Sequence, residues 1–99
     1  MPAERWSIAQ AESIAPDASA LKRARSVAGQ FGPVGLLDDV LWGLCRGYQV
    51  AADLSGPAFK CSCPSFQTPC KHAVGLVLRW AEAGAGQDPA PDWVTRWPS

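Results

Sequence analysis

Three cysteines and the chain's single histidine lie within twelve positions, in the stretch CSCPSFQTPCKH from residue 61 to residue 72. They are Cys61, Cys63, Cys70 and His72. Thiolates and imidazoles bind borderline-soft metal ions, cysteines form disulfides, and a cysteine beside a histidine can act as a nucleophile. The cluster is therefore compatible with a metal centre, a disulfide framework or a cysteine nucleophile with a histidine base.

The spacing favours a metal centre. Cys61 and Cys63 are two positions apart, so at the end of a strand their sulfur atoms point to the same side. Cys70 and His72 have the same separation after a six-residue gap, at the expected start of a helix. Three thiolates and one imidazole suit a closed tetrahedral Zn²⁺ site, which leaves no position for water or substrate. We expect a structural zinc and no enzymatic activity.

The two other interpretations are less favourable. A Cys61–Cys63 disulfide would close a very tight ring, and a nucleophile needs a pocket and an orienting third group, for which no nearby residue is an obvious candidate. The N-terminal residues do not resemble a secretory signal, and no stretch is long and apolar enough to span a membrane. These features predict a cytoplasmic location, where stable disulfides are rare.

Short strands are expected to lead into this cluster. Residues 41–45 and 48–54 predict two strands, joined by a two-residue turn at Arg46-Gly47. A further turn at 55–57 returns the chain as a strand over 58–61. The middle of the chain therefore predicts a small antiparallel meander.

A helix over 70–83 should follow the cluster. Thr68 is its expected N-cap, with Pro69 in the first helical position and Gly84 closing the helix. Residues 84–92 predict a flexible connector. Residues 91–97 predict one more helical turn with Trp93 and Trp97 on one face.

The chain before the strands predicts one amphipathic helix over 18–28, with Asp17 as its N-cap. The sequence FGPVG at 31–35 should end this helix, and a short helical turn is expected over 36–40. Cys45 and Trp42 are expected to be core residues.

These elements predict an α+β fold, in which zinc-stapled antiparallel strands precede a helix in a ββα-like core, with an additional N-terminal helix. The 99 residues suffice for one small domain, whose thin core gains from a metal staple. We divide the chain into an N-terminal extension (1–16), a helix and connector (17–40), the zinc core (41–84) and a tail (85–99).

The formal net charge is zero, so nucleic acid would have to bind a local basic patch. The candidate side chains are those of Lys60, Lys71, Arg79, Lys22, Arg23 and Arg25. For the last three, a solvated helix face is the simpler interpretation. Two functions are favoured about equally: weak binding of DNA or RNA, and a protein-interaction adaptor. The adaptor would present Trp6, Phe66 or the Trp93/Trp97 tail; neither a membrane nor a small-molecule substrate is expected.

The spacing C-x-C-x6-C-x-H of the cluster resembles the SWIM-type zinc finger. Its flanks LWGLCRG (41–47), YQVAADLSGPAFKCSCPS (48–65), PCKHAVGLVL (69–78) and PDWVTRW (91–97) are similar to bacterial members. The resemblance implies a strand–strand–helix zinc core that binds DNA or other proteins, often within larger assemblies. Bacterial relatives commonly carry a longer loop where Gly47 here runs directly into Tyr48, so contacts made by that loop are not expected.

Overall fold

The structure is a computed structural model that describes residues 6–15, 17–54, 58–62, 70–86 and 89–95. Its elements are α1 (Ile8–Ser13), α2 (Ala18–Ala28), β1 (Phe31–Leu37), β2 (Val40–Cys45), β3 (Tyr48–Asp53), β4 (Ala58–Cys61), α3 (Lys71–Ala83) and α4 (Asp92–Thr95). The predicted α+β class is confirmed.

The strands form one antiparallel sheet in the order β1-β2-β3-β4. The three strands predicted from the sequence are present, and α2 ends at Ala28, ahead of the FGPVG stretch that was predicted to end it. The helical turn predicted over 36–40 is wrong, because β1 begins at Phe31 and continues to Leu37. Its pairing with β2 shifts between Phe31 and Val34, so Gly32 and Pro33 lie at an irregularity of an edge strand. Such a position tolerates proline, which cannot donate to a sheet hydrogen bond.

The first helices are capped by polar side chains. A carboxylate oxygen of Asp17 accepts a hydrogen bond from the Ala20 amide at 2.7 Å, which confirms the predicted start of α2. The short helix α1 was not predicted; Ser7 and Gln10 form a reciprocal capping box at its start.

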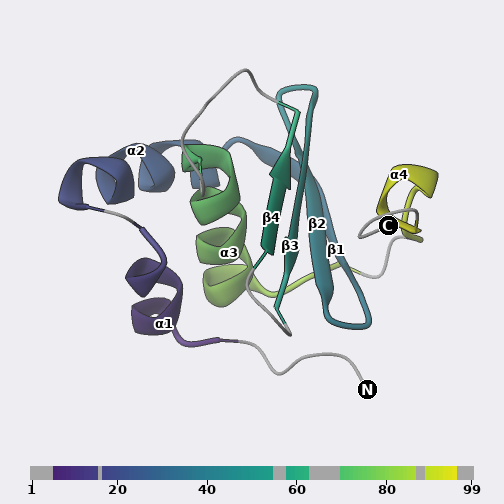
Figure 1. The fold of residues 1–99 in the computed structure, drawn as a ribbon, viewed down its shortest axis with the longest axis horizontal. Coiled ribbons are helices and arrows are strands. Elements are labelled where there is room, and N and C mark those ends of the chain that lie inside the picture. The colour runs from purple at the N-terminus through teal and green to yellow at the C-terminus, as the bar shows by residue number, and fades with distance from the viewer. Residues whose placement is uncertain (1–5, 16, 55–57, 63–69, 87–88, 96–99) are drawn as a thin grey trace.

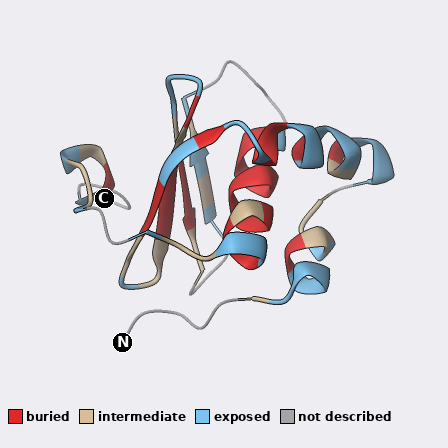
Figure 2. Ribbon diagram, turned by 180° about the vertical axis from the view of Figure 1, so that it is seen from behind, coloured by how far each residue is buried: buried red, intermediate tan, exposed pale blue. Residues whose placement is uncertain are grey.

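The layers are arranged around α3 (Figure 1). This helix covers one face of the sheet, with α1 and α2 packed on its other side, and α4 lies on the opposite face, here called the back face. Nine of the 13 residues of α3 are buried, which Figure 2 shows as an almost continuous red helix. A Cβ added at Gly75 would come within 2.7 Å of Val27 Cγ2, so the glycine permits the close approach of α2.

The back face carries a smaller apolar cluster around Trp42, Ala51 and Val94. The Trp93 ring of α4 meets the Trp42 ring edge-on, with centroids 6.4 Å apart. The Gly86 amide donates to the Val34 carbonyl at 2.7 Å and forms a bridge to β1. The predicted flexible connector therefore contributes a fixed contact to the sheet.

Candidate metal centre

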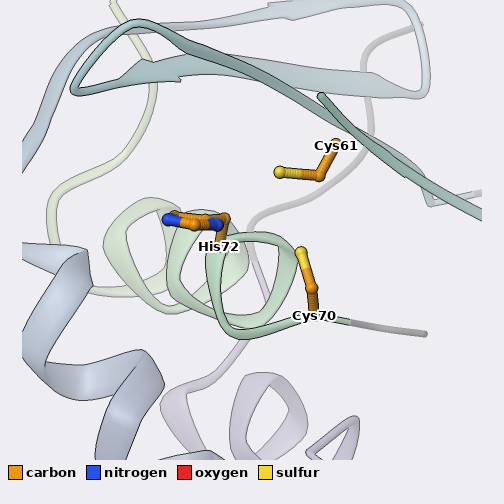
Figure 3. Close-up of side chains that lie close together, drawn as sticks. All are labelled: Cys61, Cys70 and His72. Atoms are coloured by element: carbon orange, nitrogen blue, oxygen red, sulfur yellow. The ribbon is translucent and has the colours of Figure 1, made fainter. Parts of the chain in front are cut away.

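Three of the four predicted ligands come together where β4 ends and α3 begins. Cys61 is the last residue of β4, Cys70 immediately precedes α3, and His72 lies in the first turn of that helix. Their candidate ligand atoms all lie within 4.8 Å of one another. Figure 3 shows the three side chains grouped between the strand and the helix. Cys63, the fourth predicted ligand, lies outside the described residues.

The end of β4 is fixed by β3. Cys61 pairs with Val50, whose buried side chain faces α3. Beyond the strand, the Ser62 amide donates to the Gln49 carbonyl at 3.0 Å, and the Gln49 amide donates to Ser62 Oγ at 2.9 Å. Because these bonds continue the pairing past Cys61, the backbone beside this sulfur is held in place.

The start of α3 differs from the prediction in its capping residue. Cys70, not Thr68, is the N-cap, and its side chain makes no capping hydrogen bond. Thr68 and Pro69 themselves lie outside the described residues. The N-cap was predicted at Thr68 because threonine followed by proline is a common helix start, whereas cysteine is not among the preferred N-cap residues. The positive end of the helix dipole favours the thiolate form of a cysteine at this position.

The described residues fit a zinc ion. His72 is only 7% exposed, and its Nδ1 is buried without a hydrogen-bond partner among the described residues. Leaving such an atom unpaired costs about 1–3 kcal/mol, which a metal bond would offset. Zinc bond lengths place tetrahedral ligand atoms about 3.5–3.8 Å apart, so shifts of roughly 1 Å would complete the contacts. When bound, zinc would cross-link the sheet to α3.

Tyr48 and Cys45 adjoin the centre. The Tyr48 ring lies 5.0 Å from the His72 ring, and Tyr48 pairs with Cys45 across β2 and β3. Cys45 is fully buried, as expected of a core residue, and burial raises the pKa of its thiol while the charges of Arg46 and Lys71 act to lower it. Trp42 is also buried, as predicted.

The predicted basic residues lie on three elements, namely α2, β4 and α3. Lys71 is exposed at the start of α3, beside His72. Lys60 is exposed but pairs with Ala51 of the back-face cluster, so it points to the opposite face of the sheet from Cys61. Arg79 is half-buried further along α3.

The remaining basic candidates are exposed on α2, namely Lys22, Arg23 and Arg25. Arg25 forms an ion pair with Glu12 of α1, which the sequence did not reveal because α1 was not predicted. Because Arg25 is already paired with a carboxylate, it is the least suitable of the three for contacting a phosphate.

Two further residues beside the centre were not selected from the sequence as functional. Arg46 is exposed in the β2–β3 turn, where its Nη1 donates to Gln30 Oε1 at 3.5 Å. Tyr48 follows two residues later and is 37% exposed. The hairpin register pairs Tyr48 with Cys45, and the Tyr48 ring lies over that of His72. The sequence pattern did not indicate that this turn lies beside the metal centre.

Charge is distributed unequally between the two ends of the sheet. The end that contains the metal centre, here called the zinc end, comprises the Arg46-Gly47 turn, the end of β4 and the start of α3 (Figure 1). The other end, here called the acidic end, carries Asp38 and Asp39 in the β1–β2 turn, Asp53 at the end of β3 and Glu82 in the last turn of α3. The other described carboxylates belong to α1, the cap of α2 and α4.

The tryptophans expected to be exposed are engaged within the fold. The Trp6 ring lies 6.2 Å from that of Trp80, and Trp93 packs on Trp42. Both are half-buried. Phe66 and Trp97, the other suggested anchors, lie outside the described residues.

Residues 48–81 match the SWIM zinc finger family. The match spans β3, β4 and most of α3, and it includes the four predicted ligands. No curated protein and no solved structure matches the chain. Within the described residues, no helix is long and apolar enough to cross a membrane. The family match and the cysteine–histidine group together identify a zinc-binding module.

Proposed function

We propose that this zinc module binds DNA or RNA weakly through the zinc end and catalyses no reaction. With Cys63 as the fourth ligand, the metal would have a closed coordination sphere and a structural role. Its task would be to hold β4 against the start of α3, and thereby to keep the surface at this end in shape. We include a cytoplasmic location in the proposal, because cysteines in a reducing compartment are suited to metal binding.

The observation that carries the proposal is the separation of charge along the sheet. Arg46 and Lys71 are exposed at the zinc end, whereas the described carboxylates of the sheet and of α3 lie at the acidic end. A neutral chain can therefore present a local positive surface to a phosphate backbone. Few cations take part, so we expect weak binding that decreases steeply with salt.

Fluorescence anisotropy with labelled DNA, at low and at high salt, tests this proposal. Replacement of Arg46 and Lys71 by glutamate should remove most of the binding. The matched control replaces Lys22 and Arg23, which are also exposed but lie on α2, and it should bind nearly as the parent protein does. Zinc content is measured for each variant, since Lys71 adjoins His72. Absence of binding at low salt would contradict the proposal.

The alternative function is that of an adaptor for protein partners, and the partly exposed Trp93 on the back face favours it. A partner that contacts α4 would be captured by the parent protein and lost on Trp93→Ala. The same partner should be retained by the variant with glutamate at positions 46 and 71. This pair of results would assign function to the back face and not to the zinc end.

A further inference from the structure

The Tyr48 ring is exposed to solvent on one side and contacts the His72 ring on the other. Tyr48 is one of two large hydrophobic residues that are exposed among the described residues, the other being Ile8 on α1. Its ring rests on that of the buried His72, with centroids 5.0 Å apart and planes inclined by 41°. His72 belongs to the metal centre, so its position should be fixed when zinc is bound. An aromatic ring held in this way costs little conformational entropy when a ligand stacks on its free side.

Two exposed cationic residues lie on the segments that carry Tyr48 and His72. Arg46 lies two residues before Tyr48 in a tight turn where both Arg46 and Gly47 have positive φ angles. Lys71 adjoins His72 at the start of α3. Tyr48 begins β3 directly after the Arg46-Gly47 turn, and its ring contacts that of His72 in the first turn of α3, so the turn and the helix start lie close together.

We propose that Tyr48, Arg46 and Lys71 form a binding site for one unpaired nucleotide of a single strand. The base would stack on the Tyr48 ring, and the phosphates on either side would contact Arg46 and Lys71. Aromatic stacking is available to every base, so the site would show little sequence preference. In a duplex both faces of an internal base are already stacked, so the ring would have no partner. This inference rests on the proposed function and specifies its ligand.

The test compares a short oligothymidine with a duplex of equal length, each bound to the zinc-loaded full chain at low salt. Tyr48→Ala should weaken binding of the single strand roughly tenfold, since stacking on an aromatic side chain is worth about 1–3 kcal/mol per base. Tyr48→Phe retains the ring and should bind as the parent protein does. Arg46→Glu should weaken binding and lower the slope of log affinity against log salt by about 0.7.

Two controls separate stacking from structural damage. Tyr48→Leu keeps apolar cover over His72 but removes the aromatic ring, so it should retain zinc and still lose the affinity for oligothymidine. Arg23→Glu changes an exposed cation on α2 and should leave the affinity unchanged.

The outcomes distinguish this inference from the proposed function. Equal affinity for the single strand and the duplex, with no effect of Tyr48→Leu in zinc-loaded protein, would overturn the stacking site while general nucleic-acid binding stands. No binding of either probe by the parent protein would overturn both. A preference for the single strand that depends on the Tyr48 ring would support the site.

Discussion

The two tight turns on either side of β2 have the same length but opposite surroundings. Each connects adjacent strands through two residues: Asp38 and Asp39 at the acidic end, Arg46 and Gly47 at the zinc end. Each contains a residue other than glycine in the left-handed region, with φ 53° at Asp38 and 50° at Arg46. Their backbones differ at the second residue, where Gly47 also has a positive φ of 89° but Asp39 does not. Their charge differs too, and the metal centre adjoins only the second turn.

This comparison indicates how a small domain with no net charge can carry positive charge at one end of its sheet and negative charge at the other. The strand that joins the two turns, β2, carries buried side chains toward both faces of the sheet, including Cys45 toward α3 and Trp42 toward the back face. The polar residues are thereby confined to its ends. The zinc end would depend on a metal for its shape, whereas the acidic end is closed by the pairing of Leu37 with Val40 and by the hydrogen bond from the Leu54 amide to the Asp39 carbonyl.

The largest expected effect comes from removing a metal ligand. Cys70→Ser should lose zinc and unfold at moderate temperature, because structural zinc contributes about 10–16 kcal/mol in zinc-finger peptides, comparable to the ~5–15 kcal/mol stability of a typical domain. Cys45→Ala is the matched control and should retain zinc at a cost of about 1–2 kcal/mol. Thermal unfolding followed by circular dichroism, with zinc content, measures both. Equal unfolding temperatures for the two variants would contradict the metal's structural role.

Charge changes at the two turns should differ in their effect on binding. Arg46→Glu should weaken the affinity for single-stranded DNA several-fold, because it places a carboxylate where a phosphate is expected. The double substitution Asp38→Asn and Asp39→Asn should leave this affinity nearly unchanged, since the acidic end lies at the opposite end of the sheet from the metal centre. Anisotropy titrations of both variants at the same salt concentration provide the comparison. A gain in affinity for the doubly substituted variant, as large as the loss for Arg46→Glu, would show that only net charge matters.

Glycine substitutions should separate packing from backbone strain. A Cβ at Gly35 would lie 2.5 Å from the Trp42 ring, so Gly35→Ala forces a core side chain to move and should cost about 1–3 kcal/mol. Gly47 has φ 89° and no atom within 4 Å of an added Cβ, so Gly47→Ala should cost about 1 kcal/mol through strain alone. Urea denaturation gives both values. A larger cost at Gly47 would reverse this order.

The smallest effects are expected from glycine at the two left-handed positions. Asp38→Gly and Arg46→Gly both relieve a positive φ angle but increase the freedom of the unfolded chain, so each should change stability by less than about 1 kcal/mol. Only Arg46→Gly should weaken nucleic-acid binding. Paired denaturation and anisotropy measurements test whether the turns are equivalent in stability and different in function.

The same turns show what could be predicted from the sequence. Arg46-Gly47 contains a glycine between two apolar runs and was predicted as a hairpin, whereas Asp38-Asp39 lacks one and follows a stretch rich in glycine and proline. The strand β1 was missed because its stability comes from pairing with β2 and from Trp42 packing over Gly35, which are non-local contacts.

The metal centre was predictable to a different extent in its parts. Residue type and spacing alone selected Cys61, Cys70 and His72, since few chemistries require these side chains together. The neighbours of the centre were not predictable in this way, because Tyr48 reaches His72 only through the register of β2, β3 and β4 with α3. The separation of charge could not be predicted from the sequence either. It depends on the strand pairing, which determines which turns and helix ends lie at the same end of the sheet.

Native mass spectrometry of protein purified without chelators tests the central claim most directly, namely that one zinc ion fastens β4 to the start of α3. We predict a mass increased by a single zinc per chain, and loss of the folded charge-state distribution when a chelator removes it. A metal-free chain with the charge states of a compact protein would contradict the account.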